Sequence, residues 1–148
     1  MTTSRTTHLA LRGTAASCAL ANAVIHLSLV PSHLAEKPYI GILFLVGSVV
    51  LLAVAAGLAL QRQPLGAWLI GAVTSIGMII GFLLSRTVGL PGYHESDWEP
   101  PYGVLSLVVE GIFVLTFLAW LRASGAGQVV DLRPREHPRM KAPSARLP

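Results

Sequence analysis

Four apolar segments dominate the sequence, at residues 9–30, 39–60, 65–85 and 102–121. An α-helix rises about 1.5 Å per residue, so about 20 apolar residues cross a hydrocarbon core that is about 30 Å thick. Each segment reaches that length, and the only full charges inside them are Arg12 and Glu110. The sequence therefore predicts an all-α protein, a bundle of four transmembrane helices.

Composition agrees with a membrane protein. Hydrophobic residues make up 53 % of the chain and charged residues 12 %, whereas a soluble domain has about 25 % charged residues. The basic balance, with a pI near 9.8, is explained by membrane topology, so the partner we expect is the lipid bilayer and not nucleic acid.

The basic residues fall mainly on one side of the predicted bundle. Lys37 and Arg86 lie on one side, and nine of the eleven Lys and Arg residues lie on the other: Arg5, Arg12, Arg62, Arg122, Arg133, Arg135, Arg139, Lys141 and Arg146. Cytoplasmic segments carry the Lys and Arg excess in membrane proteins. We therefore predict a multi-pass protein of the plasma membrane with both termini in the cytoplasm.

Five polar regions flank or connect the predicted helices. Residues 1–8 and the basic tail 122–148 are predicted to be disordered, because neither could bury an apolar face. The outer connections, 31–38 and 86–101, are longer than the inner one, 61–64. Leu90-Pro91-Gly92 within the second outer connection is a turn signal, with Pro at the second position and Gly at the third.

Small residues recur at helical spacing and predict close helix contacts. Ala15, Ala19 and Ala23 form one such stripe, and Gly77 and Gly81 form a small-xxx-small motif. Because lipid is as apolar as leucine, transmembrane helices associate through close packing that small residues permit. These stripes fit packing within the chain, or else the interface of a homodimer or of a subunit in a membrane complex.

Glu110 is the most informative single residue. It lies about 12 Å below the outer boundary at helical rise, where ionisable groups are costly and face the bundle interior. His26 lies at a comparable depth, and His33 follows on the same helical face if the helix continues through Pro31. Glu110 is thus either part of a binding site or a buried lock between helices that bridges to His26 or Arg86.

The outer connections offer further ligands for a metal ion, including Glu36, His94, Glu95, Asp97 and Glu99. Imidazole and carboxylate groups together suit several transition metals, and a site needs three or four of them. His26, His33, His94 and Glu110 are the candidate metal ligands. The chain has no CxxC or HExxH motif that would fix their spacing.

Arg86 ends the third segment on the side where basic residues are rare. It either extends toward lipid headgroups or folds inward onto Glu110 or a carboxylate of the outer connection. With inward pairing, Arg86, Glu110, His26 and Glu36 would form one polar cluster.

Several short motifs carry a resemblance to a known group. They are IHL at 25–27, HLAE at 33–36, GILF at 41–44, SRTVGLPG at 85–92 and WEP at 98–100, followed by Glu110. Over residues 20–115 the chain resembles small four-helix integral membrane proteins of high-GC Gram-positive bacteria. The resemblance implies that architecture and groups His26, His33, Arg86 and Glu110 as a set, but it implies no activity.

The sequence favours a non-enzymatic membrane protein whose outward-facing polar cluster binds a transition-metal ion or another small ligand. The alternative is a structural or assembly subunit in which the cluster only locks helices together. A weaker alternative is a membrane redox enzyme that uses haem or quinone.

Overall fold

The computed structural model describes the backbone of residues 2–131 and the side chains of residues 5–125. Within these residues it contains four helices and no strand: α1 (Thr2–Glu36), α2 (Pro38–Leu60), α3 (Leu65–Arg86) and α4 (Tyr102–Asp131). Each predicted apolar segment is a helix, so the all-α prediction is confirmed. All four helices are long and apolar enough to cross a membrane.

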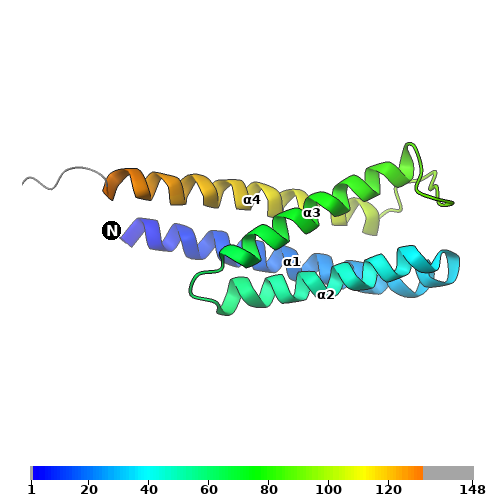
Figure 1. Cartoon of the computed structure of the whole chain (residues 1–148), viewed down its shortest axis with the longest axis horizontal. Coiled ribbons are helices and arrows are strands. Elements are labelled where there is room, and N and C mark those ends of the chain that lie inside the picture. Colours follow the sequence, from blue (N-terminus) through cyan, green and yellow to red (C-terminus); the bar gives the residue numbers. More distant parts are fainter. Residues whose placement is uncertain (1, 132–148) are drawn as a thin grey trace, which may run out of the picture.

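The helices form an elongated bundle in which consecutive helices run in opposite directions (Figure 1). α1 packs against α2 and α4, and α3 packs against the same two helices from the other side. We call the end that carries Lys37 and the 87–101 connection the loop end. The opposite end, with the α2–α3 connection and the first residues of α1, is the terminus end.

Outward-facing side chains are apolar along the bundle. Leu60, Val73 and Leu115 are exposed by 82 %, 72 % and 67 %. A soluble protein rarely presents such a continuous apolar surface, whereas hydrocarbon lipid is the solvent that this surface suits.

α1 is longer than the predicted segment at both ends. It includes residues 2–8, for which the sequence predicts disorder, and it continues through Pro31 to Glu36. The hydroxyls of Ser28 and Ser32 donate to the carbonyls of Ile25 and Leu29, and the Lys37 N–H donates to the carbonyl of His33. Pro31 has no N–H to donate to the carbonyl of Leu27 four residues earlier, yet α1 continues past it to Glu36.

The first outer connection is consequently a single residue, Lys37, and not the predicted loop 31–38. The second one begins with the predicted turn, in which Leu90 and Tyr93 exchange backbone hydrogen bonds of 2.7 and 2.9 Å. Gly92 has a φ of +64°, which the third turn position requires. α4 begins directly after Pro101 and extends past residue 121 to Asp131, and the rest of the predicted tail lies outside the described residues.

The half of the bundle near the terminus end is tightly packed. Ala15, Ala19 and Ala23 of α1 are buried in its core, as their four-residue spacing predicts. Trp68 is fully buried and stacks on Trp120 with ring centroids 5.1 Å apart. α3 and α4 come close in this half because Gly71 of α3 has no side chain, and a Cβ added there would lie 2.3 Å from the Phe113 ring.

Candidate ligand cavity

A cavity of about 260 Å³ lies between the four helices in the half of the bundle near the loop end. Most of its wall is apolar, and its polar groups come from α1, α3, α4 and the 87–101 connection, whereas α2 contributes apolar side chains. The lining includes Ile40, Leu43 and Phe44 of α2, Thr74, Gly77, Met78, Gly81, Phe82, Ser85 and Arg86 of α3, and Gly103, Ser106 and Glu110 of α4, together with His26, Leu29, His33, Leu90, Tyr93, Glu95 and Glu99.

α1 presents two buried histidines to this cavity from one face. His26 is 6 % exposed and His33 4 % exposed. The Nδ1 atoms of His26 and His33 lie 3.0 and 2.9 Å from the carbonyl oxygens of Asn22 and Leu29, one turn earlier. A carbonyl only accepts, so both rings carry a proton on Nδ1. In the neutral rings this leaves the Nε2 atoms as acceptors.

Four residues form the deep cluster: Asn22, His26, Met78 and Glu110. The Asn22 side-chain amide donates to Glu110 Oε1 at 3.0 Å and lies 3.5 Å from Met78 Sδ. His26 Nε2 lies 3.9 Å from the same Oε1. Glu110 is 2 % exposed, and its Oε2 has no hydrogen-bond partner among the described residues. In this buried carboxyl group, Oε1 is therefore hydrogen-bonded and Oε2 is not.

Five residues form the mouth cluster: His33, Arg86, Tyr93, Glu95 and Glu99. Arg86 contacts Glu95 Oε2 and lies 3.2 Å from Glu99 Oε2. Glu95 Oε1 accepts from the Tyr93 hydroxyl and lies 3.6 Å from His33 Nε2. The cluster thus joins the end of α1 to the end of α3 through the 87–101 connection.

Arg86 also fixes the backbone of that connection. Its Nε donates to the carbonyl of Asp97 at 2.9 Å, and its guanidinium lies 3.7 Å above the ring of Phe82. The Glu95 N–H donates to the carbonyl of Ser85 at 3.0 Å. Arg86 therefore pairs inward with carboxylates of the connection, one of the two predicted outcomes, and it does not reach Glu110.

Burial raises the pKa of the Glu95 carboxyl above its ordinary value of 4.5. The charges of Glu99 and Glu36 act in the same direction, while Arg86 and His33 oppose it. The main cause is the loss of water around the carboxylate, which disfavours its charged form.

Phe44 separates the two clusters. Its ring centroid lies 4.8 Å from that of His26 and 4.5 Å from that of His33. Both histidines thus pack on one aromatic ring while their Nε2 atoms approach different carboxyl groups.

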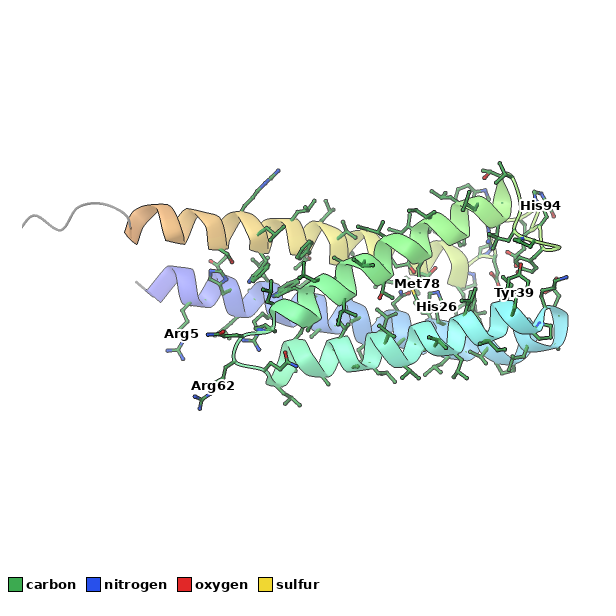
Figure 2. All side chains as sticks on the ribbon, in the orientation of Figure 1. Arg5, His26, Tyr39, Arg62, Met78 and His94 are labelled. Atoms are coloured by element: carbon green, nitrogen blue, oxygen red, sulfur yellow. The ribbon has the colours of Figure 1, made fainter. Side chains whose placement is uncertain are left out.

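The structure does not bring the four predicted metal ligands together. His26 lies beside Glu110, but His33 lies beside Glu95, and His94 is exposed on the 87–101 connection (Figure 2). Glu36, assigned by the sequence to the polar cluster, is also exposed. Within the described part of the chain, the group with metal-ligand geometry is His33, Glu95 and Glu99, whose ligand atoms lie within 4.8 Å of one another.

Gly77 and Gly81 do not form the close contact within the chain that their spacing predicts. A Cβ atom added at either position would meet nothing within 4 Å, and both residues line the cavity. The close contact on α3 is made instead by Gly71, where an added Cβ would lie 2.3 Å from the Phe113 ring. Glycines on α3 therefore have different roles: Gly71 permits close packing, whereas Gly77 and Gly81 leave space in the cavity.

Three site residues were not among those predicted from the sequence: Asn22, Tyr93 and Phe44. The signal for Asn22 was its place four residues before His26, which puts both on one helical face. Tyr93 and Phe44 gave no comparable signal, because an aromatic residue near a helix end is usual in a membrane protein.

Comparison with known proteins does not add a functional assignment: no family model, no curated protein and no solved structure matches this chain. The resemblance to four-helix proteins of high-GC Gram-positive bacteria therefore stays a prediction. The features of this chain that bear on function are therefore the cavity and its two clusters.

Proposed function

We propose that this protein is a non-enzymatic membrane protein that binds a small molecule in the cavity. The observation that carries the proposal is Glu110 Oε2, a buried oxygen without a hydrogen-bond partner that belongs to a residue of the cavity wall. Ligand sites are commonly apolar cavities in which a few polar groups fix the orientation of the ligand.

The same atom weakens the alternative in which Glu110 only locks the helices. A buried polar atom left unsatisfied costs about 1–3 kcal/mol, so a carboxyl group selected as a lock would be expected to use both oxygens. Here only Oε1 is bonded, to Asn22. A ligand group at Oε2 would remove the penalty.

We further propose that the loop end faces outward. Arg5, Arg12 and Arg62 lie at the terminus end, and the acidic residues Glu36, Glu95, Asp97 and Glu99 lie at the loop end. The Lys and Arg excess marks the cytoplasmic side. The mouth cluster would then meet solutes or lipids of the outer leaflet.

Filling the cavity tests the proposal. Gly81→Leu adds a side chain at a cavity position where a Cβ has free space, so the fold should persist. The matched control is Gly111→Leu on α4, which also has free space around its Cβ and lies outside the cavity lining. With the neutral probe 4-phenylbutanol, isothermal titration calorimetry should detect binding to wild type and Gly111→Leu, and at least tenfold weaker binding to Gly81→Leu.

Equal affinity of Gly81→Leu and wild type for 4-phenylbutanol would contradict a ligand site in this cavity. The lock alternative makes the opposite prediction for stability. Glu110→Gln should then lower the melting temperature strongly, whereas a ligand site predicts a small change because glutamine keeps an acceptor for Asn22.

A second candidate ligand is a transition-metal ion at the mouth cluster. It is favoured by the grouping of His33, Glu95 and Glu99 and by the Leu29 carbonyl. A backbone carbonyl that accepts from Nδ1 orients a metal-binding imidazole and leaves Nε2 for the ion. Arg86 opposes this candidate, since its guanidinium already pairs with both carboxylates and would repel a cation.

Elemental analysis of purified wild type, His33→Ala and His26→Ala tests the metal candidate after incubation with Zn²⁺ and removal of excess ion. Near-stoichiometric zinc in wild type and His26→Ala, with loss in His33→Ala, is the expected result for a mouth site. Zinc absent from wild type would exclude it. An absorption spectrum of the same sample tests for haem, which would give a visible band.

A further inference from the structure

We infer that the cavity takes a lipophilic amine in its ammonium form, which enters from the bilayer between α2 and α3. This inference rests on the proposed function and names the ligand class of the same site. Three observations support it: the charge of the lining, the chemistry of the wall and the place where the wall opens.

The lining carries more negative than positive groups. Its acidic residues are Glu95, Glu99 and Glu110, and its one guanidinium is that of Arg86. Three carboxyl groups stand against one guanidinium, so the lining cannot pair all of its own acidic groups with a fixed cation. Arg86 is directed to Glu95 and Glu99 at the mouth, so Glu110 has no fixed cation beside it.

Glu110 therefore favours a ligand that brings its own positive charge. An ionised carboxylate in an apolar environment is costly unless it is paired. An ammonium group placed at Oε2 would supply both the missing hydrogen bond and the missing charge. Asn22 would keep Oε1 in position through its existing bond of 3.0 Å.

The remainder of the wall suits an apolar body attached to that group. Leu29, Ile40, Leu43 and Met78 provide aliphatic or thioether surface, and the aromatic rings are Phe44, Phe82 and Tyr93. Aromatic faces attract cations through their quadrupole. A bare metal ion would leave this part of the cavity unused.

The wall opens sideways between α2 and α3. Leu43 of α2 is 58 % exposed and Gly77 of α3 is exposed, although both line the cavity. Toward the other end the two helices are in contact, since Cβ atoms added at Gly57 and Gly71 would lie 2.9 Å from Ala67 and Val54. Beside the opening, the flexible side chain of Met78 reaches the backbone of α2 at Gly47. α3 is inclined to α2 (Figure 1). In a bilayer this opening faces lipid, which suits a membrane-dissolved ligand.

Three probes of one shape test the ligand class: 4-phenylbutylamine, 4-phenylbutanol and 4-phenylbutyrate. Calorimetry on protein in nanodiscs should show the amine binding at least tenfold more tightly than the alcohol, and the alcohol more tightly than the carboxylate. In Glu110→Gln the amine should lose at least tenfold in affinity while the alcohol changes less than threefold.

The outcomes separate this inference from the proposed function. Binding of all three probes with equal affinity, lost in Gly81→Leu but unaffected by Glu110→Gln, would overturn the amine and leave the ligand cavity standing. No binding of any probe to wild type would overturn both.

The proposed entry between α2 and α3 is tested by the rate of ligand association. Gly77→Leu adds bulk at the opening, so the association rate of 4-phenylbutylamine in stopped-flow experiments should fall at least fivefold relative to Gly111→Leu. An unchanged association rate would overturn entry between α2 and α3.

Discussion

At the scale of single residues, Glu95 and Glu110 differ in how many partners their carboxyl groups have, and this difference follows their depth in the bundle. Glu95 lies in a connection where Arg86, Tyr93 and His33 all approach it. Glu110 lies about 12 Å into α4, eight residues past Tyr102 at helical rise, and only one of its oxygens is hydrogen-bonded. The Glu95 carboxyl group therefore holds the connection to the helix ends, whereas one oxygen of the Glu110 carboxyl group is available for a ligand.

The raised pKa of Glu95 predicts an unusual pH dependence of stability. A carboxyl group that binds its proton more tightly in the folded than in the unfolded state adds stability below about pH 4.5, the ordinary value. That contribution is lost as the pH rises through the raised pKa. From pH 4.5 upward, wild type should therefore lose stability relative to Glu95→Gln. Thermal unfolding of both proteins at a series of pH values measures this change.

The control for this prediction is Asp97→Asn, which changes an exposed carboxyl group of the same connection. Any pH dependence that Asp97→Asn shares with Glu95→Gln is subtracted as a general effect of removing a carboxyl group from this connection. A wild type that gains stability relative to Glu95→Gln over that pH interval would contradict the prediction.

The candidate site was only partly predictable from the sequence, and the reason is geometric. Counting residues along α1 and α4 placed His26 and Glu110 at matching depth, and the two side chains are 3.9 Å apart. Helical rise is regular, so such counting works inside a span. It fails for the 87–101 connection, where the backbone path and not the spacing decides that Arg86 meets Glu95 and that His94 points elsewhere.

At the scale of elements, α2 ends on a side chain from another helix. The Nε of Arg12 on α1 donates to the carbonyl of Leu58 at 2.9 Å, and its Nη2 donates to that of Gln61 at 2.8 Å. The last carbonyls of a helix have no partner within the helix, and a cation there also meets the negative end of the helix dipole. A charge that looked out of place in an apolar segment thus caps a neighbouring helix.

Removing this cap should destabilise the terminus end. We expect Arg12→Gln to lower the free energy of unfolding by about 1–2 kcal/mol, the scale of a lost charged hydrogen bond and dipole interaction. Hydrogen exchange of the last turn of α2 should accelerate. Arg62→Gln, at an exposed position of the same end, is the control and should change stability by less than about 0.5 kcal/mol; equal effects of the two variants would argue against a cap.

The existence and type of each helix followed from the sequence, whereas three boundaries did not: both ends of α1 and the end of α4. Long apolar runs leave no alternative to helices in lipid, because backbone groups must be satisfied internally. Pro31 is a usual signal for a helix end, but α1 continues past it for five residues to Glu36. That continuation brings His33 onto the face of His26, so the misplaced boundary also decides the composition of the mouth cluster.

At the scale of the whole molecule, the two ends of the bundle differ in charge. Arg5, Arg12, Arg62 and Arg122 lie along the part of the bundle nearer the terminus end, and four acidic residues lie at the loop end. The cavity opens near the acidic end, and the tightly packed aromatic residues Trp68 and Trp120 lie toward the basic end. The molecule is therefore polarised along its long axis in both charge and packing.

This polarity predicts an orientation in which both termini are cytoplasmic. A reporter that is active only in the cytoplasm should be active when fused after Pro148 and silent when inserted at Val88, which is 80 % exposed in the connection of the loop end. A reporter that requires the opposite compartment should give the reverse pattern at both positions. An active cytoplasmic reporter at Val88 would instead place the cavity mouth inside the cell. Ligands would then reach it from the cytoplasm or the inner leaflet, and the source of the amine would have to be sought there.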